Sequence, residues 1–361
     1  METKKNFYNI WLALLGVLIL GGLYTTFKII MEGHGILGGN DMLVWTMPIA
    51  TYVFLALMSS GFVQLSSFPA VFDLGKYKHL ARRFSYMALA TLLAAFLALS
   101  LELGSLFKMV YFIFSPNLSS PMWWMSAIYL AELVFIMSKL ISSRKSKQTP
   151  KPLSIISSGV SVLAPLMLGA IFSMIETRPV FFGLFIPVFF LALAFLSATA
   201  MVILWNFILD FLETGKNTTA ATNIVELFSK GFEFALGISI LLYAMRFVFK
   251  ATTNLDAFTA SITLFPILML VISFILIKLP ASNSNKNYPP SALLALIGIV
   301  GCHMELLYDG QARTVGVLKG IMPEVAPYWS NPWEWLIFLF AIGVMFALYT
   351  LGEKVFQLNE T

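Results

Sequence analysis

The residues that could do chemistry in this chain are a few ionisable side chains within long apolar segments. Glu132 is the deepest of them, since it follows Pro121 by eleven residues in such a segment. At about 1.5 Å of helical rise per residue, it is expected about 16 Å below one membrane surface, near the bilayer centre. An ionisable group at that depth costs a few kcal/mol or more. Glu132 could therefore transfer protons, or it could be a structural acid that is neutral or paired with Lys139, two turns away.

His303 is the only histidine predicted to lie within a membrane span, because His34 and His79 fall in predicted loops on opposite sides. It could hydrogen-bond a carbonyl group of a ligand, or it could bond only to a neighbouring helix. Haem b between membrane helices ordinarily has two axial histidines, so bound haem is not expected. The single cysteine, Cys302, leaves no four-cysteine iron–sulfur or zinc site. If the chain transfers electrons, it must take them from a carrier that dissolves in lipid and pass them to a partner.

Composition places the chain in a membrane. Hydrophobic residues make up 59% of the 361 residues, charged residues only 11%, and the mean hydropathy is +0.85. Soluble domains have roughly 25% charged residues. The formal net charge of +5 does not indicate nucleic-acid binding, because the basic residues are scattered through predicted loops and form no stripe. The first apolar segment has no small-residue cleavage pattern and is interpreted as a retained span rather than a signal peptide.

Ten apolar runs are each long enough to cross a hydrocarbon core of about 30 Å as a helix. No internal repeat and no linker between soluble domains is visible. The sequence therefore predicts an all-α integral membrane protein with about ten transmembrane helices in a single domain, residues 1–361. The predicted spans lie near residues 8–31, 43–68, 81–104, 121–141, 153–175, 180–210, 226–250, 256–279, 290–309 and 332–355.

An even number of spans places both termini on one side of the membrane. Most of the 23 Lys and Arg residues fall in loops on that side, so the positive-inside rule predicts cytoplasmic termini. On the opposite, outer side, Arg246 and Lys250 share a helix face with Tyr243 and are expected to extend to the membrane surface. The apolar outer loop at 310–331 is expected to pack on the protein or on a partner.

The segment 101–124 forms a corner on the outer side. Glu102 closes one apolar span, aromatic residues follow, and two prolines separate that span from the next. Trp123 and Trp124 are expected at the lipid headgroup level, where amphipathic rings are favoured. This shelf could hold an amphipathic, ring-shaped ligand, or it could be an ordinary aromatic belt.

Five segments together resemble the NrfD family, the integral membrane subunits of polysulfide-reductase-like enzymes. They occur in the expected order and cover most of the chain. The segments are WTMPIATYVFLALMSSG (45–61), LELG (101–104) followed by SPNLSSPMWW (115–124), ETRPVFFGLFIPVFFLALAFLSATA (176–200), MELLYDGQ (304–311) and SNPWEWLIFLFAIGVMFALYTLGEKVF (330–356).

The resemblance implies a long, ten-span member of the family, similar to the membrane subunit of tetrathionate reductase, in a prokaryotic cytoplasmic membrane. The NrfD-like core is expected at residues 43–310, with additional spans at 8–31 and 332–355. Such proteins bind a quinone or menaquinone near the outer face and contain neither haem nor metal. They contact an iron–sulfur cluster protein on the outer face, which in many complexes serves a molybdopterin catalytic subunit. The resemblance thus implies a quinone-interacting membrane anchor of a respiratory oxidoreductase.

The sequence departs from the family pattern at two places. Many members have an aspartate and an arginine in the segment where this chain has Glu102 and Ser105, and the basic residue is moved here to Lys108. Leu57 replaces a common glycine in the first core helix. A complete set of quinone contacts is therefore not transferred from the family.

The remaining candidates combine the resemblance with the residue types. Arg178 is expected near the outer surface, where it could stabilise a quinone anion or pair with Glu102 or Glu176. Two alternatives stay open: an ion-coupled secondary transporter, which would have two related inverted halves, and a structural anchor without a quinone pocket. The candidates for contact with a quinone head group are Tyr52, Glu102, Trp123, Glu176, Arg178 and His303, and Glu132 is the candidate for proton transfer.

Overall fold

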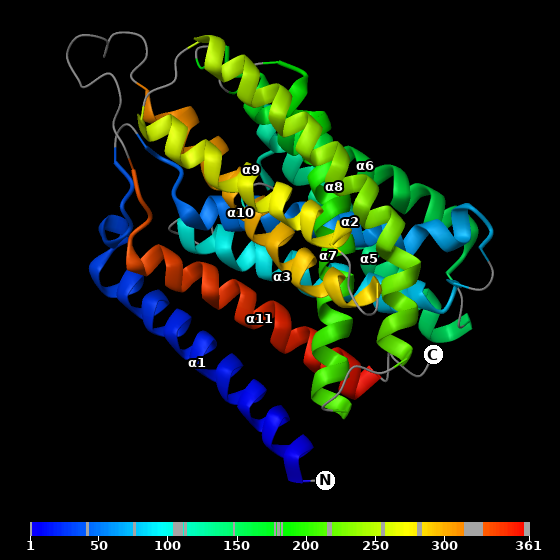
Figure 1. Ribbon diagram of the computed structural model, residues 1–361. Coiled ribbons are helices and arrows are strands. Elements are labelled where there is room, and N and C mark those ends of the chain that lie inside the picture. Colours follow the sequence, from blue (N-terminus) through cyan, green and yellow to red (C-terminus); the bar gives the residue numbers. More distant parts are fainter. Residues whose placement is uncertain are drawn as a thin grey trace.

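Within the described residues, ten helices are long and apolar enough to cross a membrane, as the sequence predicts (Figure 1). The predicted fold class, an all-α integral membrane protein, is confirmed. The computed structural model describes residues 2–40, 43–74, 77–103, 111, 114–146, 149–176, 178, 181, 183–214, 219–253, 257–279, 284–313 and 328–356. The elements are α1 (Glu2–Glu32), η1 (His34–Ile36), α2 (Met47–Val71), α3 (Leu80–Glu102), α5 (Pro121–Ser146), α6 (Lys151–Ser173), α7 (Phe185–Thr214), α8 (Thr219–Thr253), α9 (Ala257–Lys278), η3 (Ser284–Asn287), α10 (Tyr288–Ala312) and α11 (Pro332–Phe356).

Two helices begin four or five residues later than the hydropathy pattern predicts. Helix α2 begins at Met47 and not at residue 43, because Thr46 is extended and serves as the N-cap residue. Pro48 occupies the first turn, where its missing N–H group is not needed. Helix α7 begins at Phe185, five residues after its predicted start. Residues 43–46 are therefore a non-helical approach to α2, and their backbone groups need partners outside the helix.

Helix α2 lies at the centre of the bundle. In its most apolar stretch of 18 residues, 94% of the residues are buried, against 17% in the corresponding stretch of α1. Helices α3, α6, α7 and α10 surround it. The contact with α7 is especially close at Gly61, where an added Cβ atom would lie 2.0 Å from the carbonyl oxygen of Ala194. Small residues allow membrane helices to approach in this way.

The core helices form two groups of four. Helices α2, α3, α5 and α6 make one group, α7 to α10 make the second, and α2 contacts α7 at the junction. Helices α1 and α11 pack side by side at the edge of the bundle (Figure 1). The indole N–H of Trp11 joins them by donating to the hydroxyl of Thr350 at 3.0 Å.

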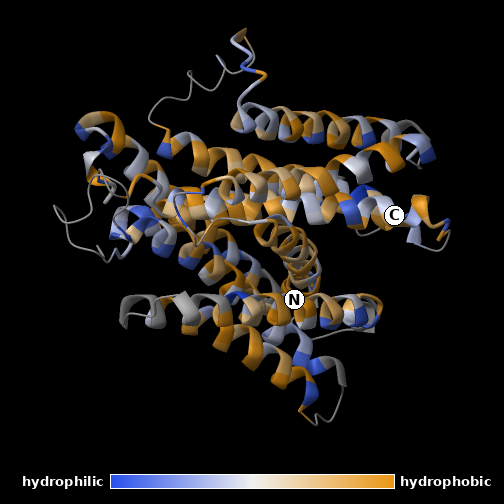
Figure 2. Cartoon of the chain, turned by 90° about the horizontal axis from the view of Figure 1, so that it is seen from above, coloured by the Kyte–Doolittle hydropathy of each residue, from blue (hydrophilic) through white to orange (hydrophobic). Residues whose placement is uncertain are grey.

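Helix α1 begins and helix α11 ends at the same end of the bundle (Figure 1). We call this end the terminal face and the opposite end the distal face. Hydrophilic residues gather mainly toward the helix ends, and apolar residues cover the middle of the helices (Figure 2). This distribution fits a bundle that spans a hydrocarbon layer.

Candidate functional site

Side chains of other helices hold the residues that lead into α2 at the distal face. Gln311 of α10 accepts hydrogen bonds from the backbone N–H groups of Val44 and Trp45, both at 2.9 Å. Glu102, the last residue of α3, accepts from the N–H group of Thr46 at 3.0 Å and from its hydroxyl at 2.9 Å. These contacts satisfy donors that would otherwise lack a partner at a helix start.

Glu334 of α11 completes this arrangement. It accepts hydrogen bonds from the N–H groups of Met47 at 3.3 Å and Gly38 at 2.8 Å, and from the hydroxyl of Tyr328. Burial and the adjacent carboxylate raise the pKa of Tyr328, so its hydroxyl stays protonated and donates. Four consecutive backbone N–H groups, 44–47, thus donate to side chains from three helices. We call these side chains the distal cap: Glu102, Gln311 and Glu334.

The Arg178 segment docks on the end of α10. Nη1 of Arg178 donates to the carbonyl oxygen of Gly310 at 2.6 Å, and partial burial lowers the pKa of the guanidinium. The ring of Phe181 lies over Gly310, where an added Cβ atom would be 1.9 Å from a ring carbon. The expected pairing of Arg178 with Glu102 or Glu176 is not found among these described residues, and Glu176 is exposed. Arg178 therefore connects the segment before α7 to the end of α10.

A second polar group lies deeper, between α2 and α5. The hydroxyl of Ser60 donates to Oε2 of Glu132 at 2.9 Å, and the carboxyl group is completely buried. The hydroxyl of Tyr52 lies 4.0 Å from the sulfur of Met125, and its ring centroid is 6.3 Å from that of Tyr129. The hydroxyl of Tyr129 lies beside Ser60. Neither this hydroxyl nor Oε1 of Glu132 makes a hydrogen bond of normal geometry with a described residue. We call these residues the Glu132 group: Tyr52, Ser60, Tyr129 and Glu132.

Lys139 lies on the terminal side of the Glu132 group. Its ammonium group donates to the hydroxyls of Ser66 at 2.5 Å and Ser67 at 2.9 Å, and the side chain is buried. The alternative in which Lys139 pairs with Glu132 is not found between these two described side chains. Lys139 is instead held by two serines of α2.

His303 lies on the other side of α2 from Tyr52. Its ring centroid is 6.3 Å from that of Phe54 and 5.6 Å from that of Phe190. Phe54 and Tyr52 are two residues apart, which separates them by about 200° around a helix. The buried ring contacts the backbone of Ile299, but neither nitrogen makes a hydrogen bond of normal geometry with a described residue. The structure thus places His303 away from the Glu132 group.

An ion pair is buried in the second helix group. Arg246 of α8 lies 3.3 Å from the carboxylate of Glu305 in α10, and both side chains are buried. Tyr243, one turn before Arg246, donates to the carbonyl oxygen of Thr263 at 3.3 Å. The expectation that Arg246 extends to the membrane surface is therefore wrong. The side chain of Lys250 lies outside the described residues.

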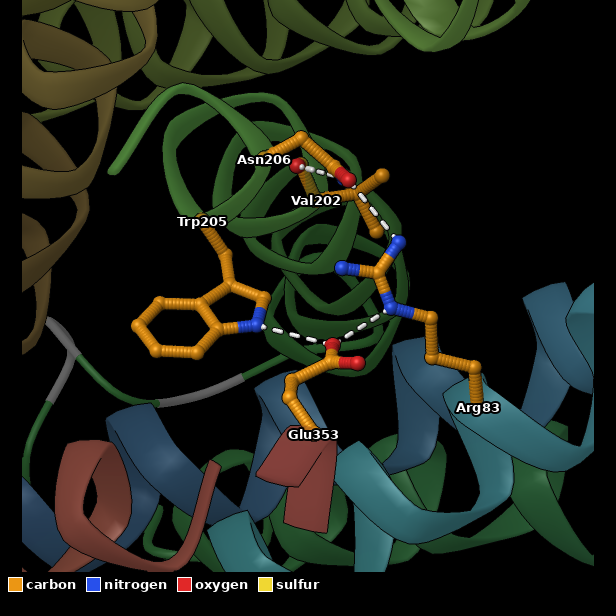
Figure 3. Close-up of polar contacts among 5 residues, drawn as sticks. All are labelled: Arg83, Val202, Trp205, Asn206 and Glu353. Atoms are coloured by element: carbon orange, nitrogen blue, oxygen red, sulfur yellow. Dashed lines mark hydrogen bonds and ion pairs between the residues drawn. The ribbon is translucent and has the colours of Figure 1, made fainter. Parts of the chain in front are cut away.

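A further buried ion pair lies toward the terminal face (Figure 3). Nε of Arg83 in α3 lies 2.6 Å from Oε1 of Glu353 in α11. The same oxygen accepts a hydrogen bond from the indole N–H of Trp205 at 3.3 Å, and Nη1 of Arg83 donates to the side-chain oxygen of Asn206 at 2.8 Å. These contacts fasten α11 to α3 and α7.

The six residues predicted to contact a quinone head group fall in separate places. Glu102 belongs to the distal cap, Tyr52 to the Glu132 group, and His303 to an aromatic environment beside α10. Trp123 is half-buried at the distal end of α5, with its ring centroid 5.0 Å from that of Trp124. Arg178 and Glu176 lie in the segment before α7. The structure therefore does not bring all six together.

Several residues of these sites were missed by the sequence analysis. Tyr129 precedes Glu132 by three residues, and this spacing on one helix face could have identified it. Thr46 and Ser60 carry no local signal, because their partners are distant in sequence. Ser105, Lys108 and most of the 310–331 loop lie outside the described residues, so the expectations for them stay predictions.

Comparisons with known proteins agree with the resemblance of the quoted segments. The family model described as "Polysulphide reductase, NrfD" matches residues 36–315. A relative from Archaeoglobus fulgidus, the "Hdr-like menaquinol oxidoreductase integral membrane subunit", is 22% identical over 347 residues, which cover 90% of this chain and 87% of that protein. The match to the family model includes α2 to α10 and ends before α11. The chain belongs to the NrfD family of integral membrane proteins.

Proposed function

We propose that this chain is the quinone-interacting membrane subunit of a respiratory oxidoreductase. It exchanges electrons between a quinone, such as menaquinone, and an iron–sulfur protein at the distal face, which serves a molybdopterin catalytic subunit. The observation that carries the proposal is membership of the NrfD family together with a relative named as a menaquinol oxidoreductase membrane subunit. The proposal also assigns the chain to a prokaryotic cytoplasmic membrane, with both termini in the cytoplasm.

The quinone head group is proposed to lie beside Tyr52 and Tyr129. Oxidation of a hydroquinone releases two electrons and two protons, so the ring oxygens need nearby donors and acceptors. The hydroxyl of Tyr129 lies beside Ser60 but makes no hydrogen bond of normal geometry with a described residue, so a ligand oxygen could bind it. Tyr52 follows the start of α2 by roughly 8 Å of helical rise. This depth is in the distal part of the bundle, close to the proposed electron-transfer partner.

The other predicted contact residues receive different roles in this proposal. Trp123 lies at the distal end of α5, the helix that carries Tyr129. It is proposed to flank the entrance to the quinone site. Glu102 and Arg178 are positioning residues, because their polar atoms already bind Thr46 and Gly310. Glu176 is exposed and His303 lies across α2, so neither is assigned a contact with the ring.

Glu132 is proposed to transfer protons between the quinone and the terminal face. Its Oε1 atom has no hydrogen-bond partner among the described residues, and its Oε2 atom is held by Ser60. Buried polar groups continue toward the terminal face. Lys139 binds two serines of α2, and the hydroxyls of Ser154 and Ser157 in α6 are buried without a described partner. Such groups need water or each other, so they favour a hydrated path.

The proton role is tested with the purified complex in proteoliposomes. Glu132→Gln keeps the shape of the side chain and removes its titratable proton, so quinol oxidation is expected to lose its coupled proton movement. Glu226→Gln, at an exposed position near the terminal end of α8, is the matched control and is expected to behave as the wild type. Unaltered proton movement in Glu132→Gln would remove Glu132 from the path.

The quinone site is tested by removing single hydroxyls. Tyr129→Phe and Tyr52→Phe are expected to raise the KM for a menaquinol analogue by about 2–10-fold, the range expected for the loss of one hydrogen bond. Tyr349→Phe removes a buried hydroxyl that binds Thr91 in another part of the bundle, and it serves as the control. Equal KM values for all three variants would reject the site.

The partners are tested by purification of the tagged full chain from its native membrane. An iron–sulfur protein and a molybdenum-containing protein are expected to co-purify. Recovery of the chain in an active quinol-oxidising complex without an iron–sulfur protein would contradict the proposed electron path.

A further inference from the structure

A shallow groove runs along the lipid-facing side of α8 and α9 in the terminal half of the bundle. Its volume is about 510 Å³. Gly237 lies at its floor, because a Cβ atom added there would have no neighbour within 4 Å. Phe274 of α9 forms one wall. The groove is lined by Lys230, Glu233, Phe234, Gly237, Ile238, Leu241 and Phe274.

The end of the groove nearest the terminal face is polar, and its lining includes the lysine Lys230 and the carboxylate of Glu233. Lys278 lies 2.5 Å from Oε2 of Glu233, and Oε1 of Glu233 accepts a hydrogen bond from Tyr288. The ammonium group of Lys278 also lies 5.5 Å from the ring centroid of Phe274. Lys230 lines the groove and is exposed beside this pair, and the carboxylate of Glu233 is already bound by Lys278. Glu226, one turn nearer the terminal face, is exposed but does not line the groove.

The rest of the groove is apolar and has the length of one membrane leaflet. Phe234 is 68% exposed and Leu241 61% exposed. From Lys230 to Leu241 the helix rises about 16 Å, and half of the hydrocarbon core is about 15 Å. Lys278 is the last residue of α9, which places the polar end near the membrane boundary. The groove therefore extends from the headgroup level to about the bilayer centre.

We propose that this groove binds one anionic phospholipid, with an acyl chain over Gly237 and the phosphate beside Lys230. The pairing of an exposed lysine with an apolar channel of leaflet length matches the charge and the length of such a lipid. Lys278 keeps its ion pair with Glu233 and holds the polar end of the groove in place. This inference goes beyond the proposed function, because it concerns the outer surface of α8 and α9 and requires neither a quinone nor a partner protein.

The test measures lipid retention and lipid-dependent stability of the full complex in detergent. Added phosphatidylglycerol is compared with added phosphatidylcholine, and bound lipid is counted by native mass spectrometry. The wild type is expected to retain one phosphatidylglycerol and to show a higher melting temperature with that lipid than with phosphatidylcholine. Lys230→Gln is expected to weaken phosphatidylglycerol binding about fivefold, since one lysine near a phosphate is removed.

Filling the groove provides a second, independent variant. Gly237→Leu places a side chain in the groove, where its Cβ atom has no neighbour within 4 Å, and favours helix formation, so the protein is expected to fold but to lose the retained lipid. Gly159→Leu, also on an exposed helix surface with no neighbour within 4 Å, and Lys151→Gln, an exposed lysine at the terminal end of α6, are matched controls that are expected to retain it.

Three outcomes would overturn the inference. One is equal lipid retention in Gly237→Leu and Gly159→Leu. Another is equal stabilisation of the wild type by the two lipids. The third is loss of a protein subunit from Gly237→Leu with unchanged phosphatidylglycerol binding, which would assign the groove to a protein partner.

Discussion

Glu102 accepts hydrogen bonds from both the backbone N–H group and the hydroxyl of Thr46, at 3.0 and 2.9 Å. Thr46 is the N-cap residue of α2, and Glu102 is the last residue of α3. One carboxyl group therefore binds both donors of the residue that caps the central helix, which contributes to fixing the start of that helix. Glu102, which the sequence predicted to contact a quinone, thus has a role in the fold.

The first prediction concerns the stability of this contact. Glu102→Ala leaves the N–H group and the hydroxyl of Thr46 without their acceptor and is expected to lower the free energy of unfolding by about 1–3 kcal/mol. Glu102→Gln keeps one oxygen acceptor and is expected to have a smaller effect. Thermal unfolding of the purified protein in detergent provides the measurement.

An exposed acid of the same face supplies the control for Glu102. Glu176→Ala is expected to unfold at the wild-type temperature, because Glu176 is exposed. A Glu102→Gln variant with wild-type stability and a raised KM for a menaquinol analogue would contradict the structural role and return Glu102 to the ligand site.

The second prediction concerns the contact between α2 and α7. Gly61→Ala introduces a Cβ atom 2.0 Å from the carbonyl oxygen of Ala194, so the helices must move apart. Overpacking of this kind is expected to cost about 1–3 kcal/mol or more. Gly159→Ala, where the added atom meets no neighbour, is expected to be neutral or stabilising by up to about 1 kcal/mol. Equal unfolding temperatures for the two variants would show that α2 and α7 are less closely packed.

The number and order of the helices could be predicted from the sequence because hydropathy reports burial in lipid directly. All ten spans are found, and their ends differ from the prediction by a few residues. The start of α2 was misplaced because residues 43–45 are apolar but not helical. Their conformation depends on acceptors from Glu102, Gln311 and Glu334, which are far away in sequence.

The sites were less predictable because polar residues in a membrane protein pair between helices. Sequence reasoning identified Glu132 as buried, since its position within one apolar span determines its depth. It could not predict that Ser60 holds this carboxylate or that Lys139 binds Ser66 and Ser67, because helix rotation sets those contacts. For the same reason, the contact of Arg246 with Glu305 could not be predicted. The spacing of Tyr243, Arg246 and Lys250 indicated an exposed helix end.

The third prediction concerns orientation in the membrane. Cys302 is buried, so a membrane-impermeant maleimide should not label it. Ser119→Cys introduces an exposed thiol near the distal face and is expected to react in intact cells. Lys151→Cys, exposed at the terminal end of α6, is expected to react only after the membrane is permeabilised. The reverse pattern would place the termini outside and contradict the positive-inside expectation.

The fourth prediction concerns the buried ion pair between Arg246 and Glu305. Arg246→Met and Glu305→Met each leave a polar partner buried without its opposite charge, and each is expected to destabilise the protein by about 3–5 kcal/mol. The double variant removes both groups and is expected to be more stable than either single variant, because neither member of the pair then remains buried without its opposite charge. The exposed pair Lys28–Glu32 is the control, for which single substitutions to Met should leave the unfolding temperature close to that of the wild type. Additive losses in the Arg246–Glu305 double variant would mean that the two side chains stabilise the bundle independently and not as a pair.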